Sequence, residues 1–190
     1  MTNNELMKQP SPFSNRRELR TLLKQYLKEG REGEKFTWES LTTEDGLPHN
    51  WIYDLYQAKD GRIYVGTWGG GLLVINDNQW GVYQKSDGLY SNAVTCMRED
   101  QAGRIWVATD EGLNILEDNR IKDGGLGGKS LLNLTFDQHG NLWAGCWRAA
   151  HSGGGLFRWD AHLWQSFTTR EGLPGNEILK VFEDSRGNIW

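Results

Sequence analysis

The chain has 190 residues, among them 24 glycines, 10 tryptophans and 2 cysteines, and its formal net charge is −4. Two cysteines exclude a disulfide framework, and the acidic balance argues against a nucleic-acid binder, which needs many Lys and Arg contacts to phosphate. No run of about 18 apolar residues is present, and residues 1–20 lack the apolar stretch of a secretory signal. If Met1 is the true start, these features predict a cytoplasmic protein; if the chain is an internal fragment, we expect a periplasmic one.

The N-terminal segment 1–35 is predicted to contain one amphipathic helix over residues 15–29. Asn15 and Glu18 have the spacing of a capping box, and Gly30 can end the helix. One face of this helix carries the apolar side chains Leu19, Leu22, Leu23, Tyr26 and Leu27.

The charge changes sign after this segment. Residues 1–35 hold eight Lys or Arg and five Asp or Glu, whereas residues 36–190 hold thirteen and twenty. We interpret the basic helix as a cover for the side or rim of the domain that follows. A dimerisation or domain-joining helix and a membrane-surface helix are the alternatives.

Residues 36–190 contain an internal repeat of about 42 residues. A Gly-[Arg/Asn]-[Ile/Leu]-aromatic tetrapeptide recurs, and its glycines are Gly61, Gly103, Gly140 and Gly187. An acidic-Gly-Leu tripeptide precedes three of the four, and its glycines are Gly46, Gly88 and Gly172. Landmarks that recur in one order indicate a repeated structural unit.

Short apolar runs separated by turns predict β strands within each unit. In the second unit we predict strands over 94–99, 105–109 and 113–116, and fourth strands over segments such as 79–85 and 163–169. Ile52, Val94 and Ile178 are expected to open the innermost strands. The turn glycines supply positive φ, and the aspartates before them are interpreted as turn formers. Each unit is therefore predicted to be a four-stranded antiparallel sheet.

A repeat of this length, with four strands and one aromatic per unit, predicts an all-β fold, a β-propeller of four-stranded blades over residues 36–190. The recurring aromatics are expected to pack between blades, and they are Tyr64, Trp106, Trp143 and Trp190. About three and a half blades do not close a ring of about six to eight. We therefore expect a fragment of a longer protein that self-associates through exposed blade edges.

The repeat resembles a known family. Written out, it begins [DE]GLxxN and continues through a strand to [EK]D-x-G-[RN]-[IL]-[WY]. Matching stretches are EDGLPHN (44–50), EDQAGRIWVATDEGL (99–113), REGLPGN (170–176) and EDSRGNIW (183–190). The unit resembles the two-component regulator propeller repeat, which forms the sensory propeller of many bacterial hybrid histidine kinases. The resemblance implies a ligand-reading input module joined to a kinase and an output domain.

The third unit departs from the pattern. The glycine-rich stretch 124–128 replaces the acidic-Gly-Leu turn, and Cys146 stands where the other units have Thr67 and Thr109. An insertion, residues 147–154, precedes its Gly-Leu pair. We expect this unit to carry more ligand contacts than its neighbours.

Catalytic motifs are not evident in the sequence. It has no G-x-S-x-G, no H-E-x-x-H and no P-loop, and its glycine runs lead into strands. Cys146, His151 and His139 fit structural zinc spacing poorly, so we interpret them as core or loop residues and expect no metal and no cofactor.

The candidate ligand-binding residues lie where innermost strands begin and second strands end, because these loops surround the mouth of a propeller channel. The candidates are His49, Asn50, Trp51, Trp68, Trp147, Arg148 and His151. Asn92, Asn176 and Glu177 occupy matching places. A capping role within its own loop is the alternative for each asparagine, and packing is the alternative for the others. Aromatic rings beside Arg and His would suit a sugar or an anionic small molecule.

These observations predict a non-enzymatic, ligand-sensing propeller of a bacterial signalling protein. The alternative in another class is a scaffold propeller that binds a protein partner. A propeller lyase or glycosidase is less favoured, because converging acid and base residues are not evident in the sequence.

Overall fold

The computed structural model describes residues 40–76, 79–147 and 153–190, and these form three four-stranded antiparallel sheets. The first sheet contains β1 (Ile52–Gln57), β2 (Ile63–Thr67), β3 (Leu72–Asn76) and β4 (Gln79–Tyr83). The second contains β5 (Val94–Glu99), β6 (Ile105–Thr109), β7 (Gly112–Glu117) and β8 (Arg120–Gly125). The third contains β9 (Leu131–Phe136), β10 (Leu142–Cys146), β11 (Gly155–Trp159) and β12 (Trp164–Phe167). The strands of each sheet are hydrogen-bonded in chain order.

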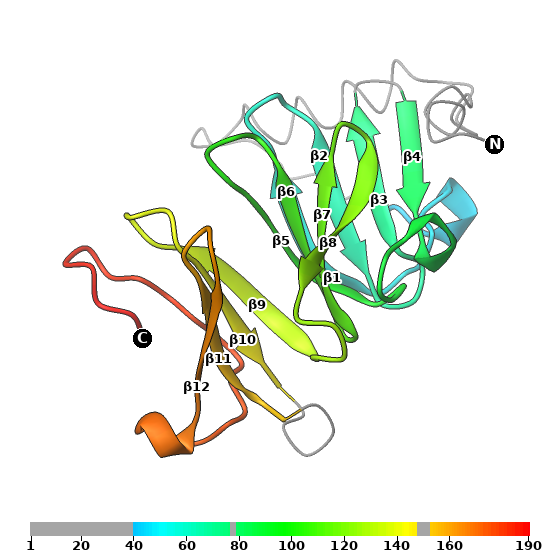
Figure 1. Ribbon diagram of the computed structural model, residues 1–190. Helices are drawn as coiled ribbons and strands as arrows, with labels where there is room; N and C mark the ends of the chain where they lie inside the picture. Colours follow the sequence, from blue (N-terminus) through cyan, green and yellow to red (C-terminus); the bar gives the residue numbers. More distant parts are fainter. Residues whose placement is uncertain (1–39, 77–78, 148–152) are drawn as a thin grey trace, which may run out of the picture.

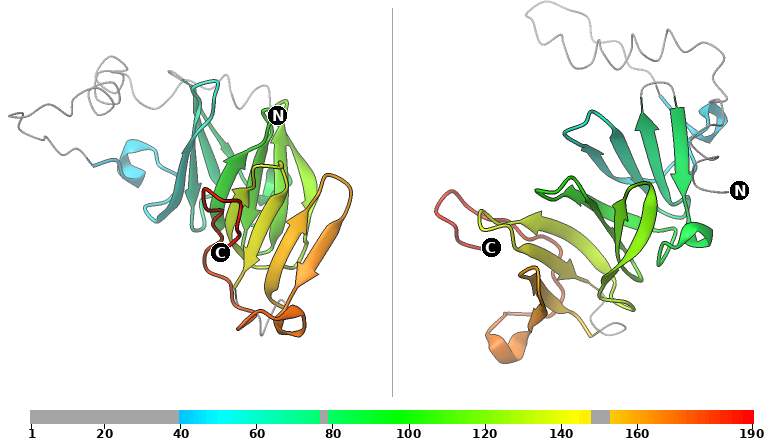
Figure 2. Two further views of the ribbon diagram at one scale, coloured as in Figure 1. Left: turned by 90° about the vertical axis from the view of Figure 1, so that its left-hand side faces the viewer. Right: turned by 45° about the horizontal axis from the view of Figure 1, so that its top comes forward.

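The three sheets follow one another as the blades of a propeller do (Figures 1 and 2). Their first strands contact in series, β1 with β5 and β5 with β9, so these strands form the inner side of the array. The fold class predicted from the repeat is confirmed. The helix predicted over 15–29 lies outside the described residues. No helix among the described residues has the length and apolar character needed to cross a membrane.

Short 3-10 turns lie before the first sheet, between the first and second sheets, and after the third, and each ends at the glycine of an acidic-Gly-Leu tripeptide. These turns are η1 (Thr43–Asp45), η2 (Lys85–Asp87) and η3 (Thr169–Glu171). Gly46, Gly88 and Gly172 have φ of 100°, 108° and 104°, the left-handed region that glycine enters without a Cβ clash. The third sheet is entered differently, because residues 123–125 belong to β8. The departure predicted for the third unit is thus visible in the fold.

The sheets pack face to face at positions where a small residue meets apolar side chains of the next sheet. A Cβ added to Gly66 in β2 would lie 2.8 Å from the sulfur of Met97 and 3.0 Å from Val94 in β5. At the equivalent place in the third sheet, a Cβ on Gly145 would lie 2.9 Å from Ile178. Burying these apolar surfaces is the main favourable contribution to the fold.

Side chains of the innermost strands add hydrogen bonds between sheets. Asp54 accepts from the backbone N–H of Met97 at 2.9 Å, Cys96 from that of Leu134 at 3.3 Å, and Asn133 from that of Val181 at 2.9 Å. All three acceptors occupy one repeat position. Asp54 also pairs with Arg98 at 2.9 Å. The first strands are therefore joined in a fixed register.

The two outer faces of the array are open. Leu55 in β1 is 65% exposed, although its counterparts in β5 and β9, Met97 and Leu134, are buried by a preceding sheet. Beyond β12, Phe182 is 56% and Trp190 73% exposed. These faces correspond to the blade edges at which self-association was predicted.

Some strand predictions were too long. The fourth strands end at Tyr83 and Phe167 because the 3-10 turns follow at once. The segment that starts at Ile178 pairs with its neighbour only through the bridge Glu183–Ile189. Tyr64 and Trp106 are buried between sheets as predicted, whereas the half-buried Trp143 stacks on Phe167 of its own sheet.

Candidate functional site

The loops that precede the first strands and those that follow the second strands meet at one end of the array, here called the rim. Backbone hydrogen bonds join them: Trp68 donates to Trp51 at 3.0 Å, Gly69 to Asn92 at 3.0 Å, and Asp110 to Ala93 at 3.2 Å. In the third sheet, Trp147 donates to Ser130 at 2.9 Å. The sequence prediction that these two sets of loops share one end is confirmed.

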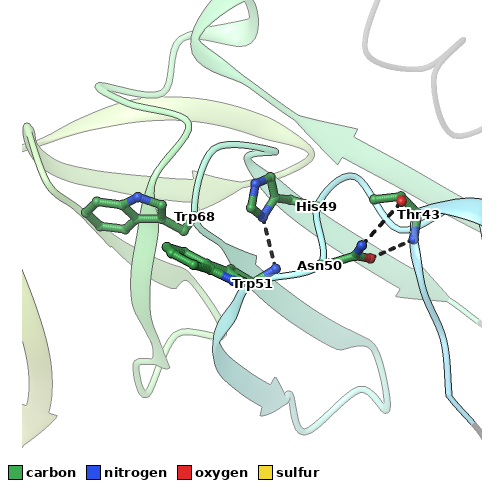
Figure 3. A pocket seen from close by; sticks show the side chains of 5 residues that line it. All are labelled: Thr43, His49, Asn50, Trp51 and Trp68. Atoms are coloured by element: carbon green, nitrogen blue, oxygen red, sulfur yellow. Dashed lines mark hydrogen bonds between the residues drawn. The ribbon is translucent and has the colours of Figure 1, made fainter.

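A pocket of about 400 Å³ opens at the rim of the first sheet (Figure 3). Four of the predicted site residues line it together with a threonine of η1, and the lining is Thr43, His49, Asn50, Trp51 and Trp68. The structure therefore brings Trp68, which follows β2, next to residues of the loop that precedes β1. None of these five side chains is Lys, Arg, Asp or Glu, so the pocket carries little charge.

Asn50 serves its own loop. Its Oδ1 accepts from the backbone N–H of Thr43 at 2.8 Å, and its Nδ2 donates to the Thr43 hydroxyl at 3.4 Å, as Figure 3 shows. Asn92 and Asn176 bind Lys85 and Thr169 in the same way, at 2.7 and 2.8 Å. The capping role that the repeat suggested for these asparagines is observed.

His49 is held beside the indole of Trp51. Its Nδ1 accepts from the backbone N–H of Trp51 at 2.9 Å, and the two rings meet edge to face with centroids 6.3 Å apart. In the neutral ring this bond places the proton on Nε2. His49 thus has a donor that its own loop does not use.

Tyr53 packs against Trp68 next to the pocket. Their ring centroids lie 5.0 Å apart with the planes tilted by 30°. Tyr53 lies in β1, is 44% exposed and was not among the predicted residues. Simple alternation along β1 does not identify it, because the pairing of β1 with β2 shifts register between Ile52 and Asp54, where Tyr53 lies.

Trp51 is 64% exposed, and its position in the repeat explains why. Its counterparts Ala93 and Ser130 are buried beneath the loop of the preceding sheet, and Ala93 forms an isolated bridge with Trp68. Trp51 therefore occupies a contact position between sheets. Trp68 holds a position that is Asp110 in the second unit, so repeat packing does not require an indole there.

The remaining candidates are spread along the rim. Trp147 is half-buried at the end of β10, and Glu177 is exposed beyond η3. Arg148 and His151 lie outside the described residues. Cys146 and His139 stand at opposite ends of β10, and the described residues hold no group of three metal-ligating side chains.

The chain matches known proteins at the level of its repeats. Residues 46–69 and 91–111 match the family model described as two component regulator propeller. Each match runs from the turn before a first strand to the end of a second strand, and so includes the rim loops. A comparison with curated proteins found no match.

Solved structures share the fold. The extracellular domain of a protein described as the hybrid two component system BT3049 from B. thetaiotaomicron aligns with a TM-score of 0.69 and 22% identity, over 83% of this chain and 22% of that one. The corresponding domain of BT4673 from B. thetaiotaomicron aligns with a TM-score of 0.66 and 26% identity, over 84% and 22%. This chain spans about a fifth of their length.

An enzyme has the same architecture. Virginiamycin B lyase from Staphylococcus aureus aligns with a TM-score of 0.55 and 13% identity, over 76% of this chain and 49% of that one. At this identity the likeness concerns the fold alone, because one propeller architecture supports unrelated activities.

Proposed function

We propose that this chain, which carries two component regulator propeller repeats, is part of the ligand-sensing propeller of a bacterial signal-transduction protein and acts outside the cytoplasm. The proposal is supported by the family match and by the likeness to domains described as extracellular parts of two component systems. The chain spans about a fifth of those domains. The proposal therefore includes a longer protein, in which a kinase or output domain is attached to the propeller.

The rim pocket is the proposed ligand site, and the observation that carries it is the clustering of Trp68, Trp51 and His49 around an uncharged cavity, with the Tyr53 ring packed against Trp68. An indole face packs well on the apolar C–H face of a pyranose, while the free Nε2–H of His49 can donate to a sugar hydroxyl. A neutral sugar fits this lining better than an anion, because no cationic side chain lines the pocket.

Binding rather than catalysis is favoured by the same lining. His49 is the only one of the five lining side chains able to act as a general acid or base, whereas acid–base catalysis commonly uses a pair of such groups. The proposed mechanism is differential binding. A ligand held by the rim loops of the first sheet, where Trp68 forms a bridge with Ala93 of the second, favours one arrangement of the two sheets, and an attached domain reports the shift.

A glycan array probed with the purified chain tests this proposal. Neutral saccharides are expected to bind, and isothermal titration with Trp68→Ala should weaken the best of them by at least about tenfold. Trp80→Ala is the matched control, since Trp80 is also half-buried but lies in β4, away from the rim pocket. Equal affinities for the two variants would contradict the proposed site.

A further inference from the structure

A second cavity opens at the other end of the array. The β5–β6 turn (100–104) and the β9–β10 turn (137–141) border it, and these turns join the strands at the ends opposite the rim. Its volume is about 360 Å³, and Trp106, Phe136 and Trp159 give it an apolar floor. The polar side chains of its lining include Gln101, Arg104 and Lys59 and the carboxylates of Glu99, Asp100 and Asp137.

The neighbouring interfaces hold a carboxylate at the matching place. Between the first and second sheets, the backbone N–H of Lys59 donates to Oε2 of Glu99 at 2.9 Å. After the third sheet, the backbone N–H of Gln138 donates to Oε2 of Glu183 at 2.8 Å. In both cases the carboxylate belongs to the next unit along the chain and holds the last position of that unit's first-strand segment.

The interface between the second and third sheets lacks this bond. Phe136 stands at the position of Glu99 and Glu183, and its ring meets that of Trp106 edge to face, 6.5 Å between centroids. Within the described residues the backbone N–H of Gln101, the counterpart of Lys59 and Gln138, meets no acceptor. A donor that holds a carboxylate in two sister interfaces is therefore open in this one.

The backbone around the open donor keeps the geometry of the sister interface. The amide of the Gln101 side chain would lie 3.4 Å from a Cβ on Gly140, and that of Gln138 lies over Gly187 in the same way. The apolar floor of this cavity also differs from the matching positions in the other two sheets. Trp159 pairs with Leu142 where the other sheets place Leu116 opposite Ile105 and Ile75 opposite Ile63.

Charge also permits an anion at this place. The carboxylate of Asp100 already accepts from Arg104 at 2.7 Å and from the indole of Trp106 at 2.9 Å, and Asp137 accepts from Trp143 at 2.9 Å. Glu183 occupies the sister position beside the same Asp137 turn, so these satisfied aspartates tolerate a neighbouring carboxylate.

We propose that this cavity, here called the lower cavity, binds a carboxylate attached to an aromatic or other apolar group. The carboxylate accepts from the Gln101 amide as Glu99 does from Lys59, and the apolar group packs on Phe136 and Trp159. This site goes beyond the proposed function, because it lies at the end of the sheets opposite the rim pocket.

Titration of the ¹⁵N-labelled chain with phenylacetate tests the proposal by NMR. The Gln101 amide resonance is expected to shift with saturation, while the Gln138 amide, which already holds Glu183 and does not line the lower cavity, stays in place. Phenylacetamide, a neutral match of the probe, should bind at least about tenfold more weakly, because a charge-assisted hydrogen bond is lost. No shift at Gln101, equal shifts at the Gln101 and Gln138 amides, or equal binding of the two probes would overturn the proposal.

Phe136→Glu provides a second test. It restores the carboxylate of the sister interfaces, so the Gln101 amide should shift without any probe and phenylacetate binding should be lost. Trp159→Leu keeps the turn and reduces only the floor, and it should weaken phenylacetate while leaving the Gln101 amide in its wild-type position. If Phe136→Glu does not fold, the titrations of the wild type and of Trp159→Leu still test the proposal. Unchanged affinity of Trp159→Leu for phenylacetate would contradict the apolar subsite.

Discussion

The indole nitrogen of Trp106 donates a hydrogen bond of 2.9 Å to Oδ2 of Asp100, the residue that opens the turn before β6. The same bond joins Trp143 to Asp137 at 2.9 Å and Trp190 to Asp184 at 3.0 Å. The other oxygen of each aspartate accepts backbone amides of its turn. One carboxylate thus fixes the turn and orients the aromatic side chain of the following strand.

Two substitutions of Trp106 separate packing from this hydrogen bond. Trp106→Ala should lower the free energy of unfolding by about 3–5 kcal/mol, since it removes a large side chain that is 3% exposed. Trp106→Phe keeps much of the bulk but leaves Asp100 without the indole donor, and should cost about 1–3 kcal/mol. Denaturant melts of the chain check both values. A loss below about 1 kcal/mol for Trp106→Ala would contradict the packing role.

Acid should weaken the fold through these aspartates. Burial raises the pKa of Asp100, but the hydrogen bonds from Trp106 and Arg104 outweigh it, so its pKa lies below the ordinary value; Asp137 behaves likewise. A lowered folded-state pKa adds stability that is complete above the unfolded value, about 3.9, and is lost as pH falls through the folded pKa. We expect stability to decline below about pH 4.

Chemical denaturation at several pH values between neutral and strongly acidic measures this effect. Asp100→Asn should lower the stability at neutral pH and reduce its dependence on pH in the acidic range. Asp118→Asn, in the exposed β7–β8 turn, is the control and should follow the wild type. A wild-type slope retained in Asp100→Asn would show that Asp100 does not carry the effect.

The close approach of the first two sheets should make Gly66 intolerant of a side chain. A Cβ there would lie 3.0 Å from the backbone oxygen of Val94 as well as against Met97, so Gly66→Ala should cost about 1–3 kcal/mol. Gly175→Ala is the matched control, because a Cβ at Gly175 meets nothing within 4 Å. Thermal melts that rank the two variants equally would exclude this contact as a determinant of packing.

The open outer faces should make the chain associate. Leu55 is 65% and Leu179 is 62% exposed, and large exposed apolar surfaces are uncommon on monomers. Sedimentation velocity over a range of concentrations should show reversible association, and Leu55→Glu should weaken it. A monodisperse monomer for the wild type at all concentrations would contradict this expectation.

Local sequence signals predicted much of the fold. The strands at 94–99 and 105–109 have the predicted bounds, because the turn between them is marked by Asp100 and Gly103. The bonds between sheets were not predicted. Asp54, Cys96 and Asn133 differ chemically, so their shared role is visible only once the strands are placed side by side.

The candidate site was predicted in part for the same reason. His49, Asn50, Trp51 and Trp68 share one pocket because the ends of first and second strands meet at the rim. The contact of Tyr53 with Trp68 depends on how two neighbouring strands twist, which repeat spacing does not encode. The open Gln101 amide of the lower cavity goes with Phe136 at the position of Glu99 and Glu183, and this relationship is visible only when the donor in the neighbouring sheet is placed beside it.

The indole N–H resonances of the chain offer the most direct test of the proposed sensor. On titration with a neutral saccharide selected from the array, the resonances of Trp51 and Trp68 should shift, while those of Trp106 and Trp143, which are bonded to turn aspartates at the other end of the strands, should not. Shifts confined to Trp106 and Trp143, or no shift in any indole with every array-positive saccharide, would contradict a ligand site at the rim.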